Sequence, residues 1–169
     1  MPGGVQDAAG ASALRLRALE AGDAAELLRI LSEEEVARWW GPVPEGFPFD
    51  EPEATRLVIE VAGRVAGLIQ YYEELEPRYR HATIDVFLDP PLRGRGIGTE
   101  AIRRVAALLI DERGHHRITI DPAASNSAAI RSYEKAGFRA VGVMRRYEQD
   151  ADGPDWHDGL LMELIAEER

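Results

Sequence analysis

Three glycines occupy every second position of the segment Arg93-Gly94-Arg95-Gly96-Ile97-Gly98, directly before an apolar-rich helical pattern. Glycine has no Cβ, so it lets backbone N–H groups approach a ligand closely. A helix that begins where this loop ends also directs its free N–H groups and its positive dipole end into the loop. The combination predicts an anion site, most naturally for phosphate.

Two common phosphate loops do not match this segment. A Walker loop needs lysine before its final serine or threonine, whereas Gly98-Thr99 has none, and the dinucleotide fingerprint needs glycine at position 99. The segment instead resembles the R/Q-x-x-G-x-G/A loop of the GNAT N-acyltransferase superfamily, which holds the pyrophosphate of an acyl-coenzyme A. On this motif alone, a ligand-free turn between a strand and a helix stays an alternative.

A second pattern lies downstream, in residues 126–138. It resembles the N-x-x-A-x-x-x-Y-x-K-x-G-F signature that follows the fifth strand of GNAT enzymes, with matches at Asn126, Ala129, Tyr133, Lys135, Gly137 and Phe138. Two motifs in the right order are far more specific than either alone. Asn126 and Tyr133 fall two turns apart on one helix face, so both can line the same groove.

The resemblance extends beyond the superfamily core. Trp39-Trp40-Gly41, Ile84-Asp85 and Asp121-Pro122 are similar to segments of aminoglycoside 6′-N-acetyltransferases. The likeness covers most of residues 14–165, is strongest over 81–138, and is weakest over 68–80 and 147–156. Tryptophan pairs also occur in related siderophore amine acyltransferases, so the pair alone leaves the acceptor open.

The resemblance implies acetyl-CoA as co-substrate and assigns roles around it. Backbone N–H groups near Phe87 and Leu88 would polarise the thioester carbonyl where the sheet splays. Tyr133 would protonate the leaving thiolate as general acid, although its position also suits a core or interface tyrosine. The other expected cofactor contacts are Arg93, Gly94, Arg95, Gly96, Ile97, Gly98, Thr99, Asn126, Ala129 and Lys135.

Asp85 is the most informative acidic residue, because aspartate is depleted inside strands and here stands between Ile84 and Val86. It either faces solvent or an ion-pair partner, or it faces the acceptor pocket. In the pocket its carboxylate would orient the attacking ammonium and could accept its proton. Unaided proton transfer from a lysine-like amine to aspartate costs roughly 8 kcal/mol, because the pKa values of the two groups are about 10 and about 3.9. The primary prediction is therefore that Asp85 orients the ammonium. For Asp85 to act as a base, desolvation or a lowered amine pKa must reduce this difference.

Further acids and two tryptophans are expected around the acceptor. Asp121 ends the next strand of the crossover, so its carboxylate should lie at the same sheet edge as Asp85. The tryptophans could stack on a sugar ring or pack in the core, and the glutamates could simply belong to a solvated loop. The predicted acceptor-binding set is Trp39, Trp40, Glu73, Glu74, Asp85, Asp121 and Asp158.

Composition restricts the class of protein. A net charge of −10 argues against nucleic acid as a partner. The acidity either steers cations such as small polycationic amines towards the protein or simply serves solubility. The sequence has no apolar run near the ~20 residues of a membrane span and no secretory signal. The absence of cysteine excludes thiolate chemistry, and the histidines lack metal-ligand spacing. We expect a cytoplasmic, metal-free monomer or homodimer, with a disordered tail over 1–13 and a single domain over 14–169.

The periodicities predict a mixed order of elements. Strands are expected over residues 14–19, 57–61, 65–72, 83–88, 117–121, 138–144 and 158–165, with a polar turn at 147–155. Helices are expected after Asp23, over 33–40, after Gly98 to about 112, and over 126–136. A helix between two strands of one sheet implies a right-handed parallel crossover. The fold class is therefore α/β (α+β): a GNAT-like, largely antiparallel sheet of about seven strands flanked by helices, with a central parallel β-α-β unit.

The sequence thus predicts an acetyl-CoA-dependent N-acetyltransferase that modifies the 6′-amino group of an aminoglycoside and confers resistance. One alternative is an N-acyltransferase for another amine, such as a siderophore lysine or a protein N-terminus. Another, of a different class, is a non-catalytic acyl-CoA-binding module.

Overall fold

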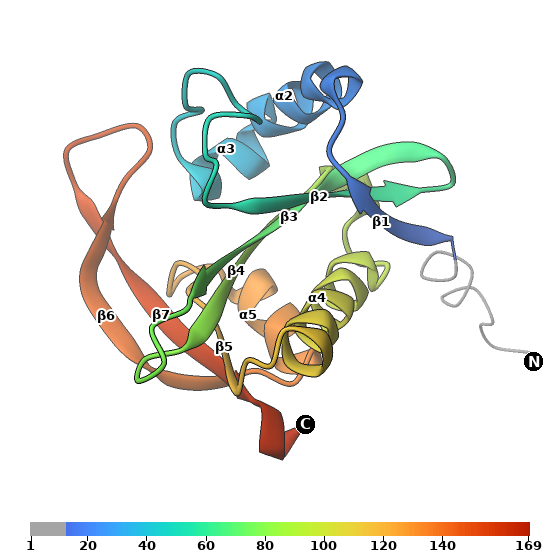
Figure 1. The fold of residues 1–169 in the computed structure, drawn as a ribbon. Coiled ribbons are helices and arrows are strands. Elements are labelled where there is room, and N and C mark those ends of the chain that lie inside the picture. Colours follow the sequence, from blue (N-terminus) through green and yellow to red (C-terminus); the bar gives the residue numbers. More distant parts are fainter. Residues whose placement is uncertain (1–12) are drawn as a thin grey trace, which may run out of the picture.

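The computed structural model describes residues 13–169, so the tail predicted over 1–13 lies outside the described residues except for Ala13. Seven strands form one sheet in the order β1-β2-β3-β4-β5-β7-β6 (Figure 1). All neighbours are antiparallel except the parallel pair β4–β5, which confirms the predicted crossover. The strands are β1 (Leu14–Ala18), β2 (Thr55–Val61), β3 (Arg64–Glu74), β4 (His81–Leu88), β5 (Arg117–Ile120), β6 (Arg139–Gln149) and β7 (Trp156–Ile165).

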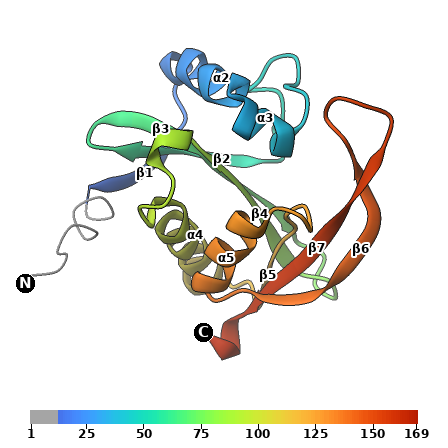
Figure 2. The same ribbon diagram turned by 180° about the vertical axis from the view of Figure 1, so that it is seen from behind.

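Four α-helices cover the two faces of this sheet. α2 (Ala24–Ser32) and α3 (Glu34–Trp40) lie on one face, and α4 (Ile97–Ala107) and α5 (Ser127–Lys135) lie on the other (Figures 1 and 2). A π-helical segment, Leu108–Glu112, extends α4 to the predicted end. Short 3-10 turns cover Ala21–Asp23, Pro90–Leu92 and Ala166–Glu168. None of the helices in the described part of the chain is long and apolar enough to cross a membrane.

Strand alternation divides the core between these two layers. On β3, Leu68 packs with the α2–α3 side, whereas its neighbour Ile69 packs with the α4–α5 side. On β4, Phe87 belongs to the first cluster and Ile84 to the second. Because successive strand residues point to opposite faces, Asp85 lies on the same face of β4 as Phe87, towards α3.

The pairing of β4 with β5 is short. The two strands pair only at Ala82↔Ile118 and Thr83↔Thr119, although β4 continues to Leu88 beside β3. Beyond these pairs β4 and β5 separate, and β5 ends before Asp121. The edge of β4 from Ile84 onwards is therefore left without a strand neighbour on that side, which opens the sheet between its two halves.

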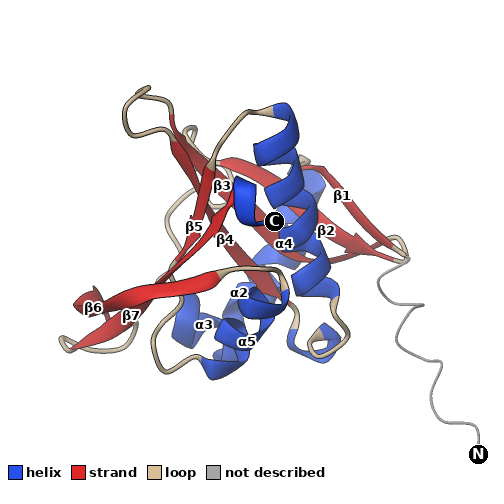
Figure 3. Cartoon of the chain, turned by 90° about the horizontal axis from the view of Figure 1, so that it is seen from below, coloured by secondary structure: helices blue, strands red, loops and turns tan. Residues whose placement is uncertain are grey.

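The C-terminal hairpin differs from the sequence expectation. The polar turn predicted over 147–155 was wrong at its start, because β6 continues to Gln149 and pairs again at Glu148↔His157. A register shift between Met144 and Glu148 interrupts the ladder, and Arg146 there adopts a positive φ of 49°. The hairpin extends beyond the helices as an arm (Figure 3). β6 is an exposed edge strand, so its polar composition resembled that of a turn.

Candidate active site

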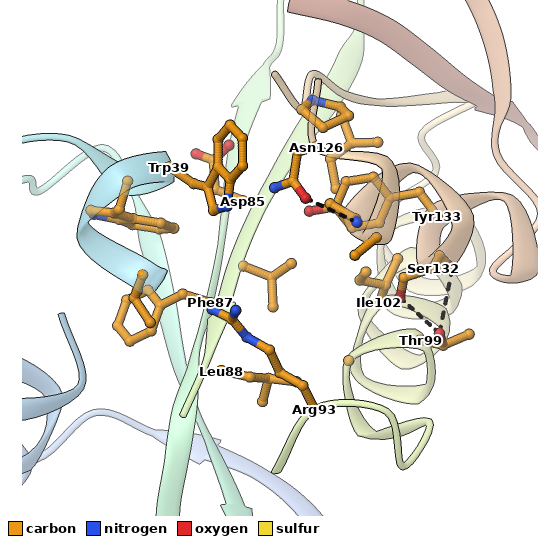
Figure 4. A pocket seen from close by; sticks show the side chains of 18 of the residues that line it. Trp39, Asp85, Phe87, Leu88, Arg93, Thr99, Ile102, Asn126, Ser132 and Tyr133 are labelled. Atoms are coloured by element: carbon orange, nitrogen blue, oxygen red, sulfur yellow. Dashed lines mark hydrogen bonds between the residues drawn. The ribbon is translucent and has the colours of Figure 1, made fainter. Parts of the chain in front are cut away.

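An open cleft of about 1280 Å³ follows the free edge of β4, between α3 with its following loop and the starts of α4 and α5 (Figure 4). Side chains from both predicted motifs and from the predicted acceptor region line it. The predicted site residues that line this cleft are Trp39, Trp40, Asp85, Phe87, Leu88, Arg93, Gly94, Arg95, Gly96, Ile97, Gly98, Thr99, Asp121, Asn126, Ala129, Tyr133 and Lys135.

The three loop glycines have different physical reasons to be glycine. Gly94 and Gly96 have φ angles of 76° and 75°, in the left-handed region that a side chain disfavours. A Cβ at either position would meet no atom within 4 Å, so both open onto free space. Gly98 packs closely instead, because a Cβ there would lie 3.1 Å from Leu88 Cδ1. The loop therefore needs glycine twice for its conformation and once for its contact.

Gly96 is the N-cap residue of α4, so the free N–H groups of that helix adjoin the cleft. Arg93 and Arg95 line the same end. The Arg93 guanidinium reaches α3, where Nη1 lies 3.4 Å from Glu35 Oε2 and Nη2 donates to the Glu35 carbonyl at 3.3 Å. Backbone donors, a helix N-terminus and two guanidinium groups together fit a diphosphate such as that of coenzyme A.

The end of β4 is held by close packing on both sides. The Phe87 ring meets Trp40 edge-on, with centroids 4.7 Å apart and an interplanar angle of 81°. On β3, a Cβ at Gly67 would lie 2.1 Å from the Phe87 carbonyl oxygen, so only glycine permits this approach. Phe87 and Leu88 both line the cleft at this point. Their polarising role towards the thioester stays a prediction.

α5 contributes Asn126 and Tyr133. Asn126 is the helix cap: its Oδ1 accepts a hydrogen bond from Ala129 N at 3.2 Å. Tyr133 is only 8% exposed. Burial first, and then the negative charges of Asp85 and Asp121, raise its pKa above the usual value. The phenol therefore stays protonated at neutral pH, as a proton donor to a departing thiolate must be.

Asp85 lies deep in the cleft, and its Oδ2 accepts a hydrogen bond from Gln70 Nε2 at 3.1 Å. Burial first, and then the charges of Asp121, Glu51 and Glu148, raise the pKa of Asp85 to about 6, whereas the Gln70 bond acts in the opposite direction. Against an amine with a pKa of about 10, this lowers the cost of proton transfer from about 8 to about 5 kcal/mol. The site thus supplies part of the desolvation that a general base requires.

The two tryptophans are used differently. Trp40 packs against Phe87 in the second core cluster, so its main contact is structural. Trp39 faces the cleft from α3 (Figure 4), and the Arg38 guanidinium lies 4.6 Å from its ring centroid. Both rings line the cleft, and Trp40 is the one that also packs against the core.

Three predicted acceptor residues do not lie at the cleft. Glu73 accepts hydrogen bonds from Arg113 and from His115, whose Nε2 lies 2.7 Å from Glu73 Oε1. Glu74 follows it, opposite His81. These two residues lie at the far end of β3, where β4 is still paired with β5, so the strand carries them beyond the cleft. Asp158 accepts a hydrogen bond from Arg146 N at 2.8 Å, which supports the irregularity in β6.

Other polar residues reach the cleft without having been predicted from the sequence. They come from the loop after α3, from β2 and β3, and from the unexpectedly long β6. Of these residues, only Gln70 could have been predicted from the sequence. It lies inside the apolar run of β3, and a buried polar residue there needs a hydrogen-bond partner. Hydrogen bonding to Asp121 first, and then burial, raises the pKa of Tyr147 to about 12. These residues are Glu51, Arg56, Gln70, Tyr147 and Glu148.

Comparison with known proteins identifies the family of this chain. Residues 17–138 match the model of the acetyltransferase (GNAT) family. The aminoglycoside N(6′)-acetyltransferase type 1 of Klebsiella pneumoniae is 29% identical over 163 residues, covering 82% of this chain and 78% of the relative.

Solved structures of the same architecture contain coenzyme A or acetyl-CoA. The AAC(6′)-Ib structure with paromomycin and acetyl-CoA superposes with a TM-score of 0.74 at 26% identity, covering 92% of this chain and 94% of the other. Spermidine N-acetyltransferase from Vibrio cholerae, with coenzyme A and spermine, gives a TM-score of 0.78 at 23% identity and covers 93% and 98%; this second likeness shows the fold alone. The chain therefore belongs to the GNAT family of acetyltransferases, as an acyltransferase that uses acetyl-CoA as its co-substrate.

Proposed function

We propose that this enzyme transfers the acetyl group of acetyl-CoA to a primary amine of a polycationic acceptor, and specifically to the 6′-amino group of aminoglycosides. One observation carries the proposal: the cleft is lined by the carboxylates of Asp85, Asp121, Glu51 and Glu148, which act electrostatically on one another at Asp85, and by the indole of Trp39. Several carboxylates suit several ammonium groups, and an indole face suits a sugar ring.

In this proposal each end of the cleft has its own role in the reaction. The acceptor ammonium binds against Asp85 and loses a proton to it, directly or through water. The neutral nitrogen then attacks the thioester carbonyl, whose oxygen takes the negative charge near Phe87 and Leu88. As the tetrahedral intermediate collapses, the C–S bond breaks and the thiolate takes the Tyr133 phenolic proton. The second proton of the attacking nitrogen is lost as the amide forms and returns through solvent to the Tyr133 phenolate. The products are the N-acetylated acceptor and free coenzyme A.

The similarity to the aminoglycoside enzymes supports this choice of acceptor. The N(6′)-acetyltransferase is 29% identical to this chain and covers 82% of it. Residues 84–85 and 121–122 also carry the pattern that suggested these enzymes from sequence. We also propose a role in antibiotic resistance, which requires that the acetylated drug no longer binds its target.

The test uses two drugs that differ at one group. Neomycin carries an amine at the 6′ position and paromomycin a hydroxyl, so the pair isolates the proposed acceptor. With acetyl-CoA and a thiol reagent, we expect thiol release with neomycin well above the drug-free rate and release with paromomycin close to that rate. Mass spectrometry should show one added acetyl group on neomycin.

Equal rates of thiol release with both drugs would mean that the enzyme acetylates an amine other than the 6′-amine. Release only with spermidine, lysine derivatives or a peptide N-terminus would replace the aminoglycoside by those acceptors. Binding of coenzyme A without thiol release in the presence of any amine would favour the alternative of a non-catalytic acyl-CoA-binding module. Expression of the chain in a susceptible bacterium, with and without Asp85→Asn, then tests resistance.

A further inference from the structure

Gln70 occupies the centre of a polar network that ends at Asp85. It lies on β3 directly opposite Asp85 on β4, and it is 4% exposed. Its Oε1 accepts a hydrogen bond from Arg56 Nε at 2.8 Å. Its Nε2 lies 3.1 Å from both Tyr72 Oη and Asp85 Oδ2. Both ends of this buried amide are thus engaged.

Arg56 decides which end of the amide faces Asp85. A guanidinium can only donate hydrogen bonds, so Arg56 must donate to the Gln70 amide oxygen. This leaves the N–H groups of that amide free to donate to the Asp85 carboxylate. The Arg56 side chain is only 6% exposed. It also donates to the Pro48 carbonyl at 2.6 Å and pairs with Asp50 at 2.6 Å and Glu51 at 3.0 Å. The same guanidinium therefore holds the loop that walls the acceptor end of the cleft.

We propose that Arg56 and Gln70 are positioning residues that fix the Asp85 carboxylate for the acceptor amine and couple it to the loop around residues 48–51. This inference rests on the proposed function. Gln70 holds Asp85 Oδ2, so the second oxygen of that carboxylate is oriented to take the ammonium and its proton. Arg56 keeps the amide from flipping and keeps Glu51 at the cleft.

The surroundings of Asp85 make the hydrogen bond from Gln70 important. Acidic and phenolic side chains from several elements lie near the Asp85 carboxylate, and the acids disfavour its charged form. The Gln70 amide is the neighbour that favours the charged form. The charged or titratable groups that act on Asp85 or on its network are Glu51, Arg56, Tyr72, Asp121, Tyr133, Tyr147 and Glu148.

The kinetic test compares Gln70→Leu and Gln70→Glu with the wild type. Leucine removes the donor, and glutamate keeps an acceptor for Arg56 while it adds a negative charge beside Asp85. We expect the acid limb of the kcat/KM profile for neomycin to move to higher pH by about one unit with leucine, and further with glutamate. The plateau kcat should fall about tenfold in both, while the Kd for coenzyme A stays within twofold.

Arg56→Lys has a matched control in Arg17→Lys. Arg17 also pairs with two acids, Asp23 and Glu60, at 2.7 Å each, but it does not line the cleft. Both changes should lower Tm. Only Arg56→Lys should raise the KM for the amine and shift the acid limb upwards. If the two lysine variants lose stability alike and neither changes the profile, Arg56 has a structural role only.

A direct titration separates this inference from the choice of acceptor. In coenzyme A-bound protein with 13C-labelled carboxyl groups, the Asp85 signal is assigned by its loss in Asp85→Asn. Its midpoint should rise in Gln70→Leu and again in Gln70→Glu, whether or not any amine is turned over. Identical midpoints in folded Gln70 variants would overturn the inference, even if the wild type acetylates neomycin. Shifted midpoints in a protein inactive on every amine would support the inference and reject the proposed function.

Discussion

The two ends of the cleft are built in different ways. The end that we propose for coenzyme A uses one continuous stretch, from β4 through the glycine loop into α4, together with the start of α5, and many of the donors it offers are backbone N–H groups. The acceptor end collects single side chains from α3, the following loop, β2, β3, β4, β6 and the end of β5. A backbone site depends on local conformation, whereas an assembled site depends on packing among distant segments. Changes at one end should therefore leave the other end largely intact.

The largest effect should come from Asp85→Asn. The amide keeps the shape of the carboxylate but cannot hold an ammonium or accept its proton. We expect kcat/KM for neomycin to fall about 10²- to 10³-fold, measured by thiol release at pH 7.5. Isothermal titration with coenzyme A should give a Kd within twofold of the wild type. A matching loss of coenzyme A affinity would mean that the two ends are not separable.

Tyr133→Phe should have the next largest effect, since Tyr133 lies where the two ends meet. Without the phenol the thiolate must leave unprotonated or find water, so kcat should fall about 30-fold. KM for the amine and Kd for coenzyme A should change little. Unchanged kcat in a folded variant would remove this phenol from the mechanism.

Gly96→Ala should damage the coenzyme A end alone. A side chain at a φ of 75° strains the loop by about 1 to 2 kcal/mol and displaces its N–H donors. We expect the Kd for coenzyme A to rise about tenfold, with KM for the amine unchanged at saturating acetyl-CoA. Gly142→Ala on β6 is the control, because a Cβ there meets nothing within 4 Å and its φ is not in the left-handed region. Equal binding by both variants would contradict the backbone site.

Lowering the pH should affect the acceptor end of the cleft and not the coenzyme A end. With the pKa of Asp85 at about 6, the carboxylate is charged above that pH and becomes protonated below it. The kcat/KM for the amine should therefore fall as the pH drops through about 6, reaching about a tenth of its plateau one unit lower. Coenzyme A binding, followed over the same range, should not show this step. A profile flat down to pH 4.5 would exclude Asp85 as the titrating group.

Glu73→Gln should have the smallest kinetic effect. The structure pairs Glu73 with Arg113 and buried His115, away from the cleft, so kcat and KM should stay within twofold. Loss of the ion pairs should lower Tm by about 3 °C, measured by calorimetry. A clear rise in KM for neomycin would instead restore Glu73 to the acceptor wall predicted from sequence.

The same contrast explains what could be predicted without the structure. Both coenzyme A motifs are local patterns, and the seven strands and the parallel crossover follow from periodicity and order. Glu73 and Asp158 were predicted at the acceptor but lie away from the cleft. Acidity does not reveal whether a carboxylate faces a ligand or a donor of its own chain, here the Arg113 side chain for Glu73 and the backbone N–H of Arg146 for Asp158. Tyr147 and Glu148 were missed because the exposed β6 has the polar composition of a turn.

The sequence by itself determined the glycine loop, the Asn126 cap, the strand that carries Asp85 and hence the family, since each depends on neighbours along the chain. Only the tertiary structure decided that Arg56 holds Gln70 and Gln70 holds Asp85, that Trp40 belongs to the core as well as to the cleft, and that Glu73 is already paired. Those contacts join residues on separate elements. Which partner a side chain finds is set by how the strands pair and the helices dock, and no local pattern in the chain carries that information.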